Sequence, residues 1–210
     1  DKNITIYGND YIIDKLGDYY FKISPLSFYQ VNPVQAEALY NYAISAAEIT
    51  KNDIVFDLYC GIGTISIFMS NYAKEVYGVE IVEQAIEMAN ENARMNKVEN
   101  THFIAGDTEF VLGDLIEKQH VIPDIVIVDP PRKGLDKTSV NNILKVKPKR
   151  IVYISCNPAS LVRDLKMLEN DYEIKVIQPF DLFCFTRTRG VLFGAIIKIL
   201  KFPTKEKNDG

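Results

Sequence analysis

The sequence predicts a doubly wound α/β fold, in which helices cover both faces of a mainly parallel β-sheet. Short apolar runs rich in β-branched residues alternate with longer segments that carry apolar residues at helical spacing. The runs lie at residues 54–59, 75–80, 101–106, 124–129 and 150–155. Because they are apolar on both faces of the strands they would form, we expect a sheet buried between two layers of helices. A chain of 210 residues can bury a full hydrophobic core.

The elements follow in order along the chain. The first 32 residues contain strand-like runs at 4–6 and 19–23, and they end at Asn32, a good N-cap, followed by Pro33 at the first helical position. The apolar face of this first helix is expected at Ala36, Leu39, Tyr40, Ala43, Ile44 and Ala47. A second helix is expected to begin near Thr64. The apolar face of a third is expected at Val82, Ala85, Ile86, Ala89 and Ala93.

The composition excludes several classes of protein. No apolar run reaches the roughly 18 residues of a membrane span, and the first ten residues resemble no signal peptide. Three cysteines cannot form a disulfide framework, and no Cys or His spacing suits a metal site. A net charge of −4 argues against unselective binding of nucleic acid. We therefore expect a monomeric protein of the reducing cytoplasm, without membrane contact.

The candidate ligand site lies at the carboxyl ends of the predicted strands, where open α/β sheets bind their ligands. Gly61 and Gly63 follow the first strand and let the backbone approach a ligand closely. The second strand ends in Glu80, whose carboxylate can accept hydrogen bonds from a ribose diol. The third is followed by Asp107 and the fourth by Asp129, which precedes two prolines.

These strand ends fit two kinds of nucleoside cofactor. The glycine pattern of a dinucleotide site, G-x-G-x-x-G, is incomplete here because position 66 is Ser66. An acid 17 residues after Gly63 fits either a nicotinamide dinucleotide or a methyl donor. The added Asp-Pro-Pro turn favours the methyl donor.

Five segments carry a family resemblance. SPLSFYQVN, DLYCGIGTISI, GVEIVEQAI, VDPPRKGLD and YISCNPASLVRDL resemble, in order and spacing, the RNA uracil-5-methyltransferases that act on transfer and ribosomal RNA. The resemblance covers about Phe21 to Phe183. It implies a class I methyltransferase fold with a seven-stranded sheet whose last strand is antiparallel. It also implies S-adenosylmethionine as cofactor and RNA as partner.

The resemblance also suggests how the chain is organised. Residues 21–202 form the catalytic domain, residues 1–20 are the end of a preceding central domain, and 203–210 are a polar tail. Family members carry an N-terminal RNA-binding β-barrel, often with an iron–sulfur cluster. The chain contains neither that barrel nor its cysteines and does not begin with methionine, so we expect a fragment, with any cluster in a region outside it.

Carried over position by position, the resemblance assigns residues to the cofactor. It places Gln30, Tyr59, Glu80 and Asp129 at S-adenosylmethionine, and Asp107 near the adenine.

Cys156 is the predicted nucleophile, for a chemical reason independent of the family. Carbon 5 of uracil is too weakly nucleophilic to take a methyl group directly. A thiolate that adds at carbon 6 creates an enolate and makes carbon 5 reactive, and a base must then remove the carbon 5 proton. Cys156 follows a predicted strand and precedes Asn157-Pro158, a helix start. Cys60 is expected to be a packing residue, and Cys184 has no assigned role. His102 and His120 are expected to lie at the surface or to have their hydrogen bonds satisfied within the fold.

The RNA is expected to meet basic and aromatic residues. Arg132 and Lys133 follow the Asp-Pro-Pro turn and could contact phosphate, whereas the lysine-rich run at 145–150 is typical of a solvated face. Phe28 and Tyr29 could stack on RNA or pack in the core.

The C-terminal region departs from the family pattern. The family has a His-Val-Glu segment after a Pro-x-Asp-x-Phe stretch, and its glutamate is the base that removes the carbon 5 proton. Residues 179–183 match the stretch, but Gly190 stands at the expected glutamate position, and no acid occurs between Asp181 and Glu206. Codons for residues 188–191 can be written ACN CGN GGN GTN, which one base later permit His-Val-Glu. We therefore hypothesise a frameshifted C-terminus without its general base.

Two other functions are open on the sequence. A catalytically impaired domain that binds only cofactor or RNA would explain the missing base and barrel. An amino-group methyltransferase would use the Asp-Pro-Pro turn to hold an exocyclic amine. That class has an aromatic residue after the prolines, where this chain has Arg132, and it needs no nucleophile such as Cys156.

Overall fold

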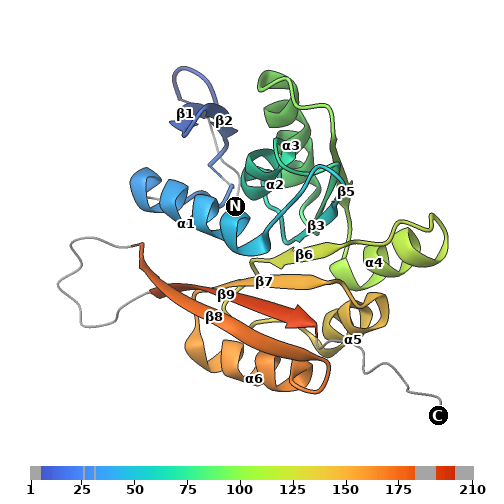
Figure 1. The fold of residues 1–210 in the computed structure, drawn as a ribbon. Helices are drawn as coiled ribbons and strands as arrows, with labels where there is room; N and C mark the ends of the chain where they lie inside the picture. The colour runs from blue at the N-terminus through green and yellow to red at the C-terminus, as the bar shows by residue number, and fades with distance from the viewer. Residues whose placement is uncertain (1–5, 26, 31, 183–192, 202–210) are drawn as a thin grey trace, which may run out of the picture.

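The computed structural model describes residues 6–25, 27–30, 32–182 and 193–201, and its centre is a seven-stranded sheet (Figure 1). In spatial order the strands are β5 (Thr101–Ala105), β4 (Glu75–Glu80), β3 (Ile54–Leu58), β6 (Ile125–Val128), β7 (Arg150–Ser155), β9 (Phe193–Lys201) and β8 (Tyr172–Asp181). Strand β9 is antiparallel to both of its neighbours, and the other adjacent pairs are parallel. The predicted doubly wound class I fold with an antiparallel last strand is confirmed.

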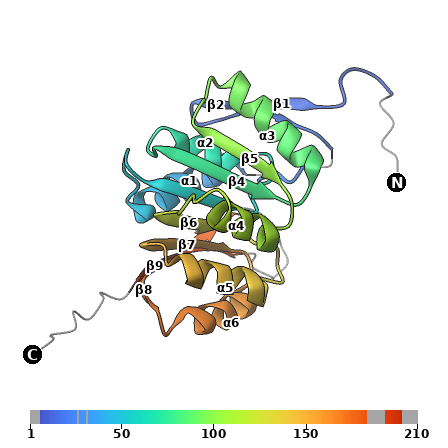
Figure 2. The same cartoon turned by 90° about the vertical axis from the view of Figure 1, so that its right-hand side faces the viewer.

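Helices cover both faces of this sheet. On one face lie α1 (Pro33–Ala47), α2 (Thr64–Ser70) and α3 (Glu83–Met95). On the other lie α4 (Thr108–Glu117), α5 (Lys137–Val146) and α6 (Pro158–Leu168), which follow one another along the sheet in Figure 2. Successive residues of a strand point to opposite faces, so Val55 joins the core under α1 whereas Phe56 joins the core under α4 and α5.

The first helix forms where its sequence predicts. The Asn32 side chain accepts a hydrogen bond from the Gln35 amide at 3.2 Å, and Pro33 occupies the first turn. All six residues of the predicted apolar face are buried. In α3 the pattern holds for Ile86, Ala89 and Ala93, but Val82 is exposed. Val82 is the extended N-cap residue of α3, so its side chain does not belong to the helix face.

A two-stranded hairpin precedes α1, and β1 (Ile12–Leu16) was not predicted from the sequence. Its partner β2 (Tyr19–Ile23) docks on α3 through asparagine amides. Buried Asn92 accepts from the Lys22 amide at 2.7 Å and donates to the Lys22 carbonyl at 3.3 Å, and Asn96 bonds Tyr20 in the same way. The side-chain amides of Asn92 and Asn96 thus form with the backbone of β2 the kind of hydrogen bonds that a neighbouring strand would form. The predicted domain boundary at residue 20 falls within this hairpin and stays a prediction.

Within the described residues, no helix combines the length and apolar character needed to cross a membrane.

Candidate active site

The loop after β3 is held by the end of β4. The amides of Tyr59 and Cys60 both donate to the Val79 carbonyl, at 2.8 and 3.0 Å. The Glu80 carboxylate then accepts from the Gly61 amide at 3.2 Å through Oε2 and from the Val82 amide at 3.0 Å through Oε1. Glu80 is therefore fixed in orientation between the glycine turn and the start of α3. Each carboxylate oxygen has a second lone pair, so the group can still accept a ligand hydroxyl.

The two glycines of this turn have different reasons to be glycine. Gly63 has φ +81°, and a Cβ there would lie 2.7 Å from Cζ of Phe103, so its side-chain space is already filled. Gly61 has φ +55°, but nothing lies within 4 Å of the position of a Cβ. Gly63 thus serves packing, whereas Gly61 leaves the turn open to a ligand.

Two carboxyl groups lie at the carboxyl ends of β3 and β6. Asp57 is fully buried under α2, where the Ser66 hydroxyl donates to its Oδ2, and its Oδ1 has no hydrogen-bond partner among the described residues. Burial raises the pKa of Asp57 to about 7 against the Ser66 hydrogen bond, and the nearby Asp129 raises it further. Burial also raises the pKa of Asp129 to about 7. A cation bound near these two carboxyl groups would favour their ionised forms.

The remaining predicted cofactor residues, Asp107, Tyr59 and Gln30, lie on three different segments of the chain. Asp107 is exposed and caps α4, accepting from the Glu109 amide at 3.0 Å, and the amide of the preceding Gly106 donates to the Glu80 carbonyl at 2.9 Å. Tyr59 has φ +68°; burial raises the pKa of its hydroxyl, and the Ser139 and Thr108 side chains act in the opposite direction. Gln30 is half-buried in the segment between β2 and α1.

Exposed apolar residues lie just beyond these strand ends, and the sequence patterns did not predict them. Ile81 comes directly after Glu80 and is 64% exposed, and Phe110 in the first turn of α4 is 70% exposed. An apolar residue placed directly after an acid at a strand end is the signal that would have identified Ile81. Phe28 is also exposed, whereas Tyr29 packs against the core near Phe21, which decides the two alternatives for Tyr29 in favour of the core.

Cys156 is half-buried between the last residue of β7 and the N-cap of α6. The N-cap Asn157 accepts from the Ala159 amide at 3.1 Å, and its Nδ2 donates to the Arg132 carbonyl at 2.9 Å. This bond joins the loop after β7, which carries Cys156, to the loop after β6, which carries Asp129. The side chains of Arg132 and Lys133 are exposed on that loop.

Of the other two cysteines, the structure describes Cys60. Cys60 is buried, and burial raises the pKa of its thiol well above the ordinary value, as suits a packing residue. Cys184 and Gly190 lie outside the described residues.

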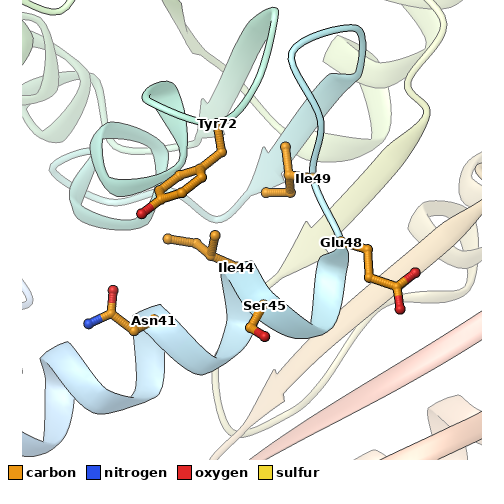
Figure 3. Close-up of a pocket in the computed structure, with 6 residues that line it drawn as sticks. All are labelled: Asn41, Ile44, Ser45, Glu48, Ile49 and Tyr72. Atoms are coloured by element: carbon orange, nitrogen blue, oxygen red, sulfur yellow. The ribbon is translucent and has the colours of Figure 1, made fainter.

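The lysine-rich run, the pocket of Figure 3 and His102 lie away from this edge of the sheet. In the lysine-rich run, Lys149 pairs with Asp124 at 2.8 Å and Arg150 lies 3.6 Å from Asp53, all at the amino end of the strands. The pocket of Figure 3 is lined by Asn41, Ile44, Ser45, Glu48, Ile49 and Tyr72, and its last two residues precede β3 and β4. In the described part of the chain, no three His, Cys, Asp or Glu residues gather as metal ligands, and His102 bonds Glu75 at 2.8 Å.

The strand order, the glycine turn and the acid at the end of β4 define the class of protein: a Rossmann-like domain of the class I methyltransferases. The profile of the tRNA (uracil-5-)-methyltransferase family matches residues 2–195, and the chain belongs to this family of S-adenosylmethionine-dependent enzymes. The predicted family is confirmed, and this membership favours the methyl donor over the nicotinamide alternative.

Curated relatives of the chain are named as RNA methyltransferases, in agreement with this family. The chain is 50% identical over 186 residues to an uncharacterized RNA methyltransferase of Clostridium tetani, covering 88% of this chain and 40% of that protein. It is 51% identical over 182 residues to one of Staphylococcus aureus strain MSSA476, covering 87% and 40%. The chain thus spans about 40% of the length of these relatives.

Among solved structures, the chain is similar to Pyrococcus abyssi tRNA (uracil-54, C5)-methyltransferase in complex with S-adenosyl-L-homocysteine. The two share 33% identity and a TM-score of 0.74, over 92% of this chain and 45% of that one. A precorrin-6y C5,15-methyltransferase from Geobacter metallireducens, at 17% identity and a TM-score of 0.62 over 79% and 89%, shares the fold.

The buried carboxyl group of Asp57 generates a prediction for stability. An ordinary aspartate has a pKa of about 3.9, and the folded value is about 7. The folded state therefore binds more protons in this window, and the free energy of unfolding should fall as pH rises from about 4 to about 7. In Asp57→Asn that part of the fall should disappear in urea titrations between pH 5.5 and 8.5.

Asp136→Asn is the matched control. Burial acts to raise the pKa of Asp136, but hydrogen bonds from Ser139 outweigh it and lower the pKa, so this carboxylate stays ionised from pH 5.5 to 8.5. The pH curve of this variant should run parallel to that of the unaltered chain. A parallel curve for Asp57→Asn as well would contradict the assignment.

Proposed function

We propose that this chain is the catalytic domain of an enzyme that methylates carbon 5 of a uridine in structured RNA, transfer or ribosomal, with S-adenosylmethionine as methyl donor and Cys156 as nucleophile. The observation that carries the proposal is the hydrogen bond from Asn157 to the Arg132 carbonyl. It supports a single site in which the loop of the cysteine and the loop of the Asp-Pro-Pro turn meet at the cofactor edge of the sheet.

The described residues fit the cofactor. Glu80 would accept hydrogen bonds from the ribose, and the open backbone at Gly61 would lie along the nucleoside. Exposed Ile81 and Phe110 offer apolar surface to an adenine ring, beside Asp107. When bound, S-adenosylmethionine supplies an electrophilic methyl group on a cationic sulfur. Its charge suits Asp129 and Oδ1 of Asp57, which has no hydrogen-bond partner in the part of the chain that the structure describes. Gln30 and Tyr59 are proposed as further contacts.

The chain's own chemistry centres on Cys156. Its thiolate adds to carbon 6 of uracil, and the electrons of the carbon 5–carbon 6 double bond shift to form an enolate. Carbon 5 then takes the methyl group as the bond from that methyl group to the donor sulfur breaks, which leaves the donor as a neutral thioether. A base removes the carbon 5 proton. The electrons of that bond restore the double bond, and the thiolate leaves carbon 6.

The RNA must present an unstacked uridine to this site. The exposed side chains of Arg132 and Lys133 are suited to phosphate, since lysine and arginine are among the residues that contact the backbone of nucleic acids. Exposed Phe28, on the segment that leads to α1, offers a face on which a base could stack.

A second function, a domain that binds cofactor and RNA but turns over poorly, is favoured by one sequence observation. Gly190 stands where the base is expected, and no acid lies between Asp181 and Glu206. Cys156 would then add to uracil, and carbon 5 of the base would accept the methyl group. The chain would release this product slowly.

The cofactor assignment predicts the effect of changing Glu80. Glu80→Ala should weaken binding of S-adenosylmethionine by roughly 1–3 kcal/mol, the scale of a lost hydrogen bond to a charged group. Glu80→Gln keeps one acceptor oxygen and should lose less. The exposed Glu87→Ala on α3 is the control and should bind normally. Calorimetry that finds unchanged affinity in Glu80→Ala would refute the assignment.

The nucleophile can be trapped. RNA that carries 5-fluorouridine should form a stable covalent adduct with the chain, because fluorine cannot be removed as a proton. Cys156→Ala should form no adduct while it binds the cofactor with nearly normal affinity. Mass spectrometry should map the adduct to Cys156, and a map to Cys60 or Cys184 would show the proposed mechanism to be wrong.

The tail hypothesis predicts a rescue. Gly190→Glu should restore part of the multiple turnover, because a carboxylate would again remove the carbon 5 proton. A chain with the frame restored from residue 188 should recover more. Rapid multiple-turnover methylation by the chain as written would overturn the hypothesis, since another group or water would then be the base.

A further inference from the structure

The loop between β6 and α5 is held by side chains of α6 and its N-cap. Asn157 donates to the Arg132 carbonyl at 2.9 Å. Nη2 of Arg163 donates to the Lys133 carbonyl at 2.7 Å and to the Leu135 carbonyl at 3.1 Å. The loop is thus bonded at three points through its backbone, which leaves the side chains of Arg132 and Lys133 exposed.

Asp164 anchors these bonds. It is fully buried, and its Oδ2 accepts from the Leu135 amide and from the Tyr153 hydroxyl, both at 2.7 Å. Its Oδ1 accepts from Nε of Arg163 at 2.8 Å and Nη2 at 2.6 Å. Both carboxylate oxygens are therefore satisfied, as a buried charge requires. Tyr153 lies on β7, three residues before Cys156, so Asp164 joins the strand of the cysteine to the loop.

The loop passes close to Asp164 only because residue 134 is glycine. Gly134 has φ +77°, and a Cβ at this position would clash with Oδ2 of Asp164 and would lie 2.7 Å from Nη2 of Arg163. The backbone conformation and the side-chain network therefore require each other. This arrangement is a physical reason for residues 132–135 (RKGL) and residues 163–164 (RD) to occur together in this chain.

We infer that Asn157, Arg163 and Asp164 are positioning residues, which hold the Arg132–Lys133 loop at a fixed place relative to Cys156. The inference rests on the proposed function. An RNA gripped through phosphate by exposed Arg132 and Lys133 must present carbon 6 of one base to the thiolate, so the separation of the two contacts has to be constant. Small misplacements of a nucleophile lower rates steeply, by about 100-fold for 1 Å.

The variant Asn157→Ser tests this inference. Serine still caps α6, but it is too short to reach the Arg132 carbonyl. Arg163→Lys is the second variant: it keeps a charge beside Asp164 but lacks the guanidinium that spans two carbonyls. Lys166→Ala, on the exposed side of α6, is the control.

Three measurements decide the outcome. Covalent adduct formation with 5-fluorouridine RNA at saturating RNA should slow about 10-fold or more in both variants. Affinity for S-adenosylmethionine should stay within about twofold, and backbone amides of residues 132–136 should exchange hydrogen faster. The control should match the unaltered chain in all three. Unchanged rates, or unchanged exchange in the loop, would overturn the inference.

Failure of the proposed function would look different. The unaltered chain would then form no adduct at Cys156, whatever the loop does. Hydrogen exchange would still decide whether the three side chains hold the loop, because it needs no RNA: faster exchange in Asn157→Ser supports the holding role, and equal exchange overturns it.

Discussion

Parallel pairing of β6 with β3 on one side and with β7 on the other is the constraint on which the candidate site depends. Leu58 pairs with Val128, so β3 and β6 end at the same level, and Val128 pairs with Tyr153, so β7 extends two residues further, to Ser155. Their loops therefore meet at one edge: the glycine turn after β3, the Asp129 loop after β6, and the Cys156 loop after β7. Leu58 and Val128, which are far apart in the sequence, become neighbours because the burial of both faces of these apolar strands specifies their register. The chemistry comes from loops, and the packed sheet gives those loops their places.

Three buried or partly buried carboxyl groups differ in how far hydrogen bonds compensate their charge. This difference separates a structural carboxylate from carboxyl groups that are suited to a ligand. Asp164 is fully buried, and each of its oxygens accepts two hydrogen bonds, so its charge is compensated within the protein. Asp57 is equally buried, but among the described residues it has one donor, Ser66, and one oxygen without a partner. The pKa of Asp129 is raised to about 7 by burial. A fold that compensates one carboxylate fully and leaves others uncompensated at a strand edge is suited to bind a cation there.

Local patterns predicted much of this structure, and long-range polar contacts account for most of what they missed. The face of α1, its cap at Asn32 and the position of Cys156 after β7 depend on neighbouring residues, and local patterns placed them correctly. The docking of β2 on Asn92 joins residues 70 positions apart, and the bond from Arg163 to the Lys133 carbonyl joins residues 30 apart. Hydropathy patterns contain no information on such bonds, so the docking of β2 and the network at Asp164 were not predicted. Val82 was missed for a local reason, since it is the extended N-cap residue of α3. The roles of the site residues, the domain boundaries and the tail at Gly190 stay predictions.

The central claim is that the carboxyl edge of the sheet binds the methyl donor beside Cys156. A crystal structure of this chain with S-adenosyl-L-homocysteine tests it most directly. We expect the ribose at the Glu80 carboxylate, the adenine between Ile81 and Phe110, and the sulfur on the side of the loops that carry Asp129 and Cys156. A nucleoside bound instead in the pocket of Asn41 and Tyr72, at the opposite edge of the sheet, would contradict the account (Figure 3).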